Sequence, residues 1–501
     1  MKPYKTLLFL TSVFVVLLTI SFTFPRNGIK INDDFTIQFV KIDDLLNFEK
    51  TQYADITNII EKISLLDDTT NSNAKKSLNV SLVDSLTSDI DSTQESLTLE
   101  IEQLSNPEKI RHLEFPNGDA SMLKNVFTSL SNAKRKKELV RILHYGDSQI
   151  EGDRITALIR YKLQTKFGGS GVGLLPATQA FDYSVSIKQT ASDNWNRYTI
   201  IDKTNAFSHK RFGLVSIMSK FTSDEQQNDS TIHESWIKFQ KSKFTYATNQ
   251  KFVQCKLLYG YNQSPVIAEL YCGNKLTKVQ TLLSNNTFNS VAWDLDNSVD
   301  ELSIKFAGKE SPEIYGIAFD DKSGVAVDNL AIRGSSGLDF TKNDPALLKQ
   351  MFKQLNVKML ILEYGINIVS QKKANYEFYE NWFYSQLDFL KKMSPDLTII
   401  VIGVSDISYN NNGVYETTPQ LEQIRDAQKN AAFKAGCAFW DLYEAMGGKN
   451  SMPSWATANP PLAAKDYSHF SYQGAKIVAQ MFYESFIYEY NQYVLLANEQ
   501  K

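Results

Sequence analysis

The residues whose types could do chemistry begin with a serine. In the stretch HYGDSQIEGD, residues 144–153, Ser148 follows Gly146 and Asp147. The stretch comes directly after residues 139–143, which are apolar at every position except Arg141. Because Gly146 permits a tight turn, Ser148 would lie between a strand and a helix, at the edge of an open α/β sheet where ligands bind. Ser148 could be a nucleophile or a cap of the next helix, and this stretch alone favours the cap.

A serine hydroxyl is a weak nucleophile unless a base takes its proton. Of the five histidines, His469 is the best placed, because it lies in the polar loop AAKDYSHFSYQGAK before the last predicted helix. Asp466 precedes it by three residues, and a carboxylate at that spacing can accept the imidazole Nδ1–H and fix the tautomer. His469 is therefore the candidate base, with a pair of ordinary loop residues as the alternative.

An acyl-transfer site also needs N–H donors aimed at one point of the sheet edge. IRGSSGLD follows a predicted strand, and Gly334 can present its backbone N–H there in an open turn. EYGINIV follows another strand, and Asn367 can offer its side-chain amide. Each motif is weak alone, but each follows a separate predicted parallel strand, so both are candidate oxyanion donors.

The elements that must position these residues alternate between apolar strands and amphipathic helices. Near-continuous hydrophobicity is typical of strands buried on both faces of a parallel sheet. The predicted strands are residues 140–144, 325–332, 357–362, 397–404 and 437–442. The predicted helices are residues 153–167, 345–355, 375–392, 419–435 and 472–490. The alternation predicts a three-layer α/β/α domain with a flavodoxin-like parallel sheet.

The alternation is interrupted between residues 181 and 318. This region has short runs rich in Val, Thr, Tyr and Phe, broken by Asn, Asp, Gly and Ser, with much period-two alternation, as in KFVQCKLLYGYN. Such a pattern predicts an antiparallel β-sandwich inserted after the first strand and helix.

The N-terminal segment is apolar and uncharged from Thr6 to Phe24, with Lys2 and Lys5 before it. Nineteen such residues at about 1.5 Å each come close to crossing a hydrocarbon core of about 30 Å. We expect an uncleaved signal anchor with its N-terminus inside; a cleaved signal peptide is the alternative, and both place the rest of the chain outside the cytoplasm.

These patterns together predict six regions. They are a signal anchor or signal peptide (1–26), a partly disordered or helical stalk rich in Ser, Thr, Asp and Asn (27–110), the first part of the α/β domain (111–180), the inserted sandwich (181–318), the second part of the α/β domain (319–493) and a tail (494–501).

Charge and cysteine content exclude some functions. A net charge of −3 over 501 residues gives no sign of a nucleic-acid surface. Cys255 and Cys272 could bridge after export, and Cys437 is expected to be a buried thiol. No C-x-x-C motif and no His/Cys cluster occurs, so no metal site is expected.

The motifs occur in an order that resembles the SGNH (GDSL-type) hydrolase family. The match covers residues 139–175 and 324–490, and its four blocks are Gly146-Asp147-Ser148, Gly334, Gly365-x-Asn367 and Asp466-x-x-His469. The resemblance implies a nucleophile at Ser148, a base at His469 and its orienting carboxylate at Asp466. It implies an oxyanion hole formed by the Ser148 N–H, the Gly334 N–H and the Asn367 amide.

One position departs from the family name, because Gln149 stands where leucine is expected. That position follows the nucleophile, so we expect Gln149 to shape the substrate pocket. In the loop EAMGGKNSMPSWATANPP, Trp455 is the best candidate for stacking on a glycan, with packing as the alternative.

The chain is more specifically similar to bacterial cell-envelope esterases that act on O-acetylated glycans and carry an inserted β-sandwich. The resemblance implies an extracytoplasmic serine esterase that removes acetyl groups from a cell-wall or extracellular glycan without a cofactor or metal. A glycan O-acetyltransferase with the same residues and an inactive glycan-binding surface protein are the alternatives. A membrane-bound acyltransferase is a possible partner.

Overall fold

The computed structural model describes residues 3–25, 28–31, 36–37, 39, 52–62, 100–104, 106–180, 183–202, 209–223, 230–296, 299–369 and 375–499. The chain divides into two units, Met1–Gln52 and Tyr53–Lys501. Most of the predicted stalk, including residues 63–99, lies outside the described residues.

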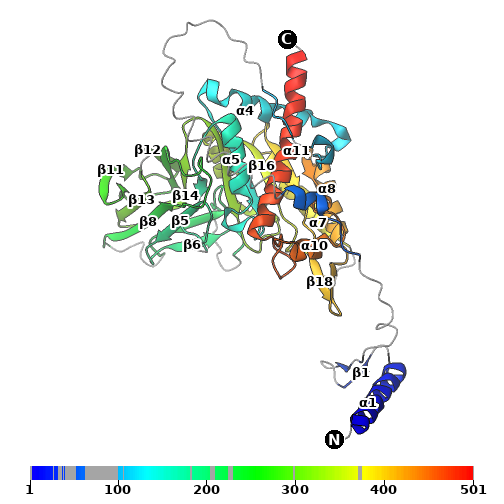
Figure 1. The fold of residues 1–501 in the computed structure, drawn as a ribbon. Helices are drawn as coiled ribbons and strands as arrows, with labels where there is room; N and C mark the ends of the chain where they lie inside the picture. Colours follow the sequence, from blue (N-terminus) through cyan, green and yellow to red (C-terminus); the bar gives the residue numbers. More distant parts are fainter. Residues whose placement is uncertain are drawn as a thin grey trace. The chain divides into compact units, whose positions relative to one another are not determined.

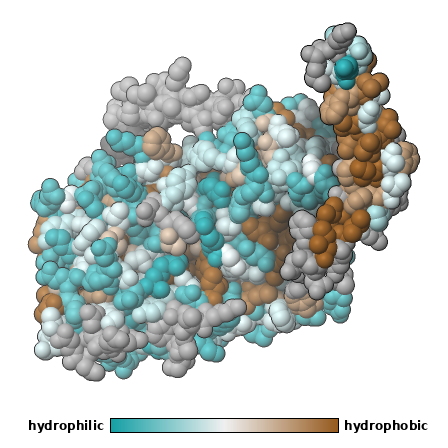
Figure 2. Space-filling view, turned by 90° about the horizontal axis from the view of Figure 1, so that it is seen from below, coloured by the Kyte–Doolittle hydropathy of each residue, from teal (hydrophilic) through white to brown (hydrophobic). Residues whose placement is uncertain are grey.

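The first unit contains one long apolar helix, α1 (Pro3–Thr23), and a short ladder of β1 (Ile29–Lys30) with β2 (Thr36–Ile37). Thr11 and Thr19 donate their hydroxyl protons to carbonyls one turn earlier, which removes unpaired polar groups from the helix surface. Figure 2 shows the apolar side chains along this helix. By length and composition, α1 is the one helix of the described chain that could cross a membrane.

The second unit is built on a sheet of five parallel strands. In spatial order they are β15 (Gly324–Ala331), β3 (Leu139–Gly146), β16 (Val357–Glu363), β17 (Thr398–Ile402) and β20 (Ala438–Trp440). Numbered in chain order, the strands are arranged 2-1-3-4-5, which is the flavodoxin-like order. All strands are parallel, but the side on which the next strand is added changes between β3 and β16, the topological switch point of the sheet. The predicted fold class is confirmed.

Helices cover both faces of this sheet (Figure 1). Alternate side chains of β16 face opposite layers, with Met359 and Ile361 on one side and Leu360 and Leu362 on the other. The first layer contains α4 (Lys124–Lys136), α5 (Thr156–Phe167) and α11 (Tyr472–Glu499). The second contains α6 (Pro345–Gln354), α7 (Glu377–Lys391) and α8 (Leu421–Lys434).

Shorter elements complete the α/β part. They are the hairpin of β18 (Ser408–Asn411) and β19 (Val414–Thr417), and the helices α9 (Leu442–Ala445) and α10 (Ser451–Thr457). Helix α11 continues to Glu499 rather than ending near residue 490, because Tyr490 and Val494 still pack into the core. The predicted separate tail is therefore mostly helix.

The insert is an antiparallel sandwich, as predicted. One sheet contains β11 (Lys275–Leu282), β10 (Val266–Cys272), β13 (Glu301–Gly308), β8 (His233–Lys241) and β5 (Ile187–Ala191). The other contains β12 (Phe288–Asp294), β9 (Gln254–Gly260), β14 (Glu313–Asp320), β7 (Ile217–Lys220) and β6 (Asn196–Thr199). The sandwich begins earlier than residue 181, because β4 (Gly173–Leu175) pairs with β14.

The cysteines form no cross-link in this structure. Cys255, Cys272 and Cys437 are all free thiols. Cys437 is buried, as expected.

A buried ion cluster fixes the sandwich to the α/β sheet. Arg141 of β3 is fully buried and donates to both carboxylate oxygens of Asp328 on β15, at 2.6 and 2.8 Å. The same guanidinium binds Asp320 of β14, and the Leu174 N–H of β4 donates to Asp328. Removing one partner of such a cluster leaves a buried charge uncompensated, so the two parts are held in one geometry.

Two described segments of the predicted stalk, residues 53–62 and 100–104, pack on the α/β core. Residues 57–62 are helical, and Ile56 and Ile59 join the core beneath α10 and α11. The Ser454 hydroxyl donates to the Ala54 carbonyl, and Tyr483 of α11 donates to Glu102. These two segments of the predicted stalk therefore contribute to the packing of the second unit.

Candidate active site

Three residues far apart in the sequence form a hydrogen-bonded chain. Ser148 Oγ lies 2.9 Å from His469 Nε2, and His469 Nδ1 lies 2.7 Å from Asp466 Oδ2. With the proton on Nδ1, the Nε2 lone pair faces the serine hydroxyl. This is the geometry in which an imidazole can take a proton from a nucleophile while a carboxylate orients it.

The turn after β3 presents Ser148 to the histidine. A Cβ at Gly146 would lie 2.8 Å from the Glu363 carbonyl oxygen of β16, so the turn needs a glycine there. Asp147 Oδ1 then accepts the Gln149 N–H at 2.9 Å and tightens the turn. Ser148 caps neither following helix, because Ile150 and Ile155 hold those positions, so the capping role is wrong.

The loop before α11 holds the base from the other side. Asp466 Oδ1 accepts the backbone N–H groups of Ser468 and His469, at 2.9 and 3.0 Å. Burial alone would raise the pKa of Asp466, but these hydrogen bonds and the one from the imidazole hold that pKa below its usual range. Asp466 is therefore ionised at neutral pH and can stabilise an imidazolium.

Two further residues tie the serine turn to the histidine loop. Gln149 Nε2 donates to the Ser468 carbonyl at 2.8 Å and to Ser405 Oγ at 3.0 Å. Arg154 donates to the Ser148 carbonyl at 2.5 Å and to the Phe470 carbonyl at 3.0 Å. Each of these side chains links the turn that carries Ser148 to the loop that carries His469. Each can therefore fix the distance between the Ser148 hydroxyl and the His469 imidazole.

The expectation that Gln149 shapes a substrate pocket is corrected by this geometry. Only 2% of Gln149 is exposed, and its amide is used inside the protein. Arg154 belongs to no sequence motif of the candidate site. Its position six residues after the serine, on the turn leading into α5, is the signal that could have identified it.

The candidate oxyanion donors come from the turns after two strands next to β3. Gly334 follows β15 with φ of +81°, and a Cβ there would meet no atom within 4 Å. Asn367 follows β16, and its amide donates to the Ser335 carbonyl at 2.9 Å, which fixes the side chain while a second N–H remains on the same nitrogen. Because β15, β3 and β16 are adjacent, these turns share one edge of the sheet with Ser148. Their role as donors to an oxyanion stays a prediction.

A polar cluster lies beneath the serine turn inside the sheet. His144 Nε2 lies 3.2 Å from Glu363 Oε2, and His144 Nδ1 lies 2.9 Å from Thr156 Oγ1. Asp147 is almost fully buried beside Glu363. Burial, with a contribution from the Glu363 charge, raises the pKa of Asp147 to about 8. Asp147 is therefore largely protonated at neutral pH.

The predicted glycan contact at Trp455 is wrong in this structure. Trp455 is fully buried, packs near Phe470, and donates its indole N–H to the Met446 carbonyl at 3.0 Å. It supports the loop that carries His469 from within. Among the described residues, no group of three or more His, Cys, Asp or Glu side chains could hold a metal ion.

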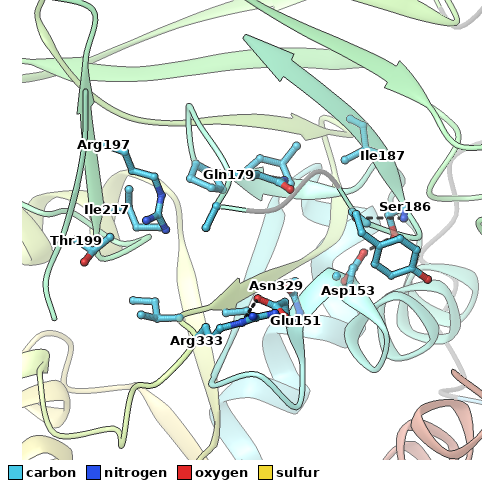
Figure 3. A pocket seen from close by; sticks show the side chains of 18 of the residues that line it. Glu151, Asp153, Gln179, Ser186, Ile187, Arg197, Thr199, Ile217, Asn329 and Arg333 are labelled. Carbon is cyan, nitrogen blue, oxygen red and sulfur yellow. Dashed lines mark hydrogen bonds and ion pairs between the residues drawn. The ribbon is translucent and has the colours of Figure 1, made fainter. Parts of the chain in front are cut away.

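A cavity of about 340 Å³ lies beside this edge, between the sandwich and the α/β sheet. Its walls include Glu151, three residues after Ser148, and Arg333, next to Gly334. Figure 3 shows the side chains that enter it from both parts.

Comparison with known proteins identifies the fold. No family model and no curated protein matches the chain. The solved structure of a peptidoglycan O-acetylesterase matches with a TM-score of 0.57 and 20% identity, over 73% of this chain and 95% of that one. The acetylxylan esterase Axe2 from Geobacillus stearothermophilus matches with a TM-score of 0.22 and 22% identity, over 32% of this chain and 71% of that one.

The chain therefore shares the fold of that esterase structure, and this fold agrees with the one implied by its four sequence blocks. The match to the peptidoglycan O-acetylesterase extends over nearly all of that protein.

Proposed function

We propose that this chain is an extracytoplasmic serine esterase that hydrolyses O-acetyl esters on a cell-wall or extracellular glycan. The observation that carries the proposal is the hydrogen-bonded chain from Ser148 through His469 to Asp466 at the carboxyl edge of the sheet. The fold shared with a peptidoglycan O-acetylesterase supports the glycan ester as the substrate class.

The reaction would proceed in two steps, acylation of the serine and hydrolysis of the acetyl-enzyme. Ser148 Oγ attacks the ester carbonyl as His469 Nε2 takes its proton, and the N–H groups of Ser148, Gly334 and Asn367 stabilise the oxyanion. Collapse expels the sugar alkoxide, which takes the proton from His469, and leaves an acetyl-enzyme. Water, deprotonated by His469, then releases acetate and restores the serine hydroxyl.

Turnover of p-nitrophenyl acetate by the full chain tests this mechanism. Ser148→Ala should lose nearly all activity above background, whereas Ser385→Ala, an exposed serine on α7, should keep the parental rate. Equal rates for the parent and Ser148→Ala would contradict the nucleophile and favour the inactive glycan-binding alternative.

The acceptor in the second half decides between hydrolysis and transfer. The same residues could pass the acetyl group to a sugar hydroxyl instead of water, and a membrane-bound acyltransferase could then supply acetyl groups. Free acetate from an O-acetylated glycan, without new esters on an added oligosaccharide, is the result expected for the esterase.

The location is part of the same proposal. Helix α1 is apolar and carries its one charge, Lys5, near its N-terminal end, which supports an anchor that leaves the second unit outside the cytoplasm. In cells converted to spheroplasts, which expose the outer face of the cytoplasmic membrane, protease added from outside should then reach the second unit. Protection until the cells are lysed would contradict this orientation.

A further inference from the structure

The cavity beside the catalytic edge has one wall from the sandwich and one from the α/β sheet. The sandwich contributes Arg197 and Thr199 of β6 and Ile217 of β7, while the sheet side contributes Asn329 and Arg333. Figure 3 shows Arg197 entering from the sandwich, opposite Arg333. A volume of about 340 Å³ is within the range of small-ligand pockets.

Arg197 differs from the other arginines of this cavity. Its Nε atom is buried and has no hydrogen-bond partner among the residues that the structure describes. Burial lowers the pKa of Arg197, and the negative charge of Asp202 opposes this shift, so the guanidinium stays charged. A buried donor without a partner is costly, which points to a ligand that completes it.

The remaining two arginines in the cavity wall are already bound to carboxylates. Arg160 donates to both oxygens of Asp153, at 2.7 and 3.1 Å. Arg333 forms an ion pair with Glu151 at 2.5 Å. Among the described residues that line the cavity, Arg197 is therefore the arginine whose buried Nε–H has no hydrogen-bond partner.

The chemistry of the wall selects the class of ligand. One guanidinium edge, with Nε–H and an Nη–H side by side, matches a planar anion of single charge. A phosphate dianion would be stabilised by more than one cation. The other two arginines of the wall are not free for this role, because Asp153 and Glu151 already neutralise them. The apolar walls at Leu175, Ile187 and Ile217 suit the carbon skeleton of a sugar ring or a peptide.

We propose that this cavity is a subsite for a carboxylate carried by the acetylated glycan, and that Arg197 of the inserted sandwich binds it. The proposal names the substrate class of the esterase and rests on that proposed function. It makes the sandwich part of the substrate site. The carboxylate can belong to the sugar ring or to a peptide attached to the glycan.

Matched substrates test the subsite in the full chain. One pair is O-acetylated polygalacturonate and the same polymer with its carboxyl groups reduced to neutral hydroxymethyl groups. The other is O-acetylated peptidoglycan fragments with their peptides, and the same fragments with all peptide carboxyl groups converted to neutral amides. Arg197→Gln should raise KM for at least one carboxylate-bearing substrate by roughly tenfold, the loss expected for a hydrogen bond to a charged group.

The controls separate this subsite from folding and from the reacting centre. Arg197→Gln should keep the parental rate on p-nitrophenyl acetate, which has no carboxylate, and should keep the parental KM on the neutral partner substrates. Arg197→Lys keeps the charge but loses the planar fork, so it should recover only part of the affinity. Lys188→Gln, an exposed cation of β5 outside the cavity, should behave as the parent.

The outcome also identifies the source of the carboxylate. A KM effect on polygalacturonate indicates a ring carboxylate, and one confined to peptide-bearing fragments indicates a peptide. An equal KM for Arg197→Gln and the parent on both carboxylate-bearing substrates would overturn the subsite. Calorimetric titration of Ser148→Ala with galacturonate oligomers and soluble peptide-bearing fragments separates the two proposals, because Arg197-dependent binding would persist even if no esterase activity were found.

Discussion

Two histidine–carboxyl pairs lie close to Ser148, one at the rim of the sheet and one inside it. His469 and Asp466 occupy a loop, and a third of the His469 side chain is exposed. His144 and Glu363 occupy adjacent strands, and His144 is fully buried. Both pairs bring a ring nitrogen to a carboxyl oxygen, at 2.7 and 3.2 Å.

The difference lies in what the second ring nitrogen meets. His469 Nε2 faces the Ser148 hydroxyl at the edge where substrate can arrive, whereas His144 Nδ1 meets Thr156, which also accepts a hydrogen bond from Asn329. The interior pair is thus enclosed in a network that joins β3, β16, α5 and β15. Both histidines have a carboxyl partner, but only His469 also faces a hydroxyl at the open edge of the sheet, which is what a general base for substrate chemistry needs.

The largest expected effect comes from exchanging each histidine for glutamine. His469→Gln should lower kcat about 10³-fold or more, since the base is lost, while Tm stays near the parental value. His144→Gln should lower the free energy of unfolding by about 1–3 kcal/mol, because it disturbs a buried hydrogen-bond network, and should keep most of the activity. Rate assays and thermal melts on both variants give the comparison. A similar loss of kcat in a stable His144→Gln variant would contradict the distinction between the rim pair and the interior pair.

The second prediction concerns the carboxyl group at the rim. Asp466→Asn keeps the size of the side chain but offers the imidazole an amide, so the Nδ1 tautomer is no longer enforced. We expect kcat to fall by about 10²–10⁴-fold with little change in KM. Glu363→Gln is the matched interior variant, and its main effect should be on stability. Equal kcat losses for these two variants would remove the distinction between rim and interior.

The alternation of apolar strands and helices is enough to predict the α/β layers, because buried parallel strands such as residues 397–404 are apolar at nearly every position. Ser148, His469 and Asp466 could also be found, since each stands in a polar turn directly after a strand or before a helix. Their meeting follows from strand order, because all carboxyl ends of a parallel sheet lie at one edge.

The interior of the site was harder to predict. Trp455 and Gln149 stand in polar sequence surroundings, yet both are buried, because the packing of the loop before α11 encloses them. Arg154 and Arg197 gain their roles from segments distant in the sequence, Phe470 for one and the cavity wall for the other. For Arg154 the sequence offers only its short distance from Ser148 as a signal, and for Arg197 no local pattern indicates the contact.

The third prediction sharpens the role of the backbone bridges. Gln149→Leu removes both amide donors and leaves the Ser468 carbonyl and the Ser405 hydroxyl without this partner. The serine and histidine would then be less well aligned, so kcat should fall by about 10-fold while KM stays similar. Ser405→Ala removes one acceptor and keeps the bond to Ser468, so its effect should be smaller. If Ser405→Ala lowers kcat as much as Gln149→Leu, the bridge to Ser468 is not what positions the base.

The smallest expected effect on activity is at Asp147, and it extends the comparison to carboxyl charge. Burial holds Asp147 protonated up to about pH 8, whereas in the unfolded chain it ionises near pH 3.9. Between these values only the unfolded state releases the proton, so this group makes stability fall as pH rises, by up to about 1.4 kcal/mol per pH unit, with no further fall above pH 8. Asp147→Asn keeps the oxygen that accepts the Gln149 N–H and removes the titration.

Urea unfolding at pH 5 and pH 8 should therefore show a smaller loss of stability in Asp147→Asn than in the parent, with kcat at pH 7 close to parental. An equal loss of stability in both proteins would mean that Asp147 is ionised in the native state. The buried carboxyl group of Asp147 and the carboxyl group of Asp466 at the rim would then have the same charge, and this part of the comparison would fail.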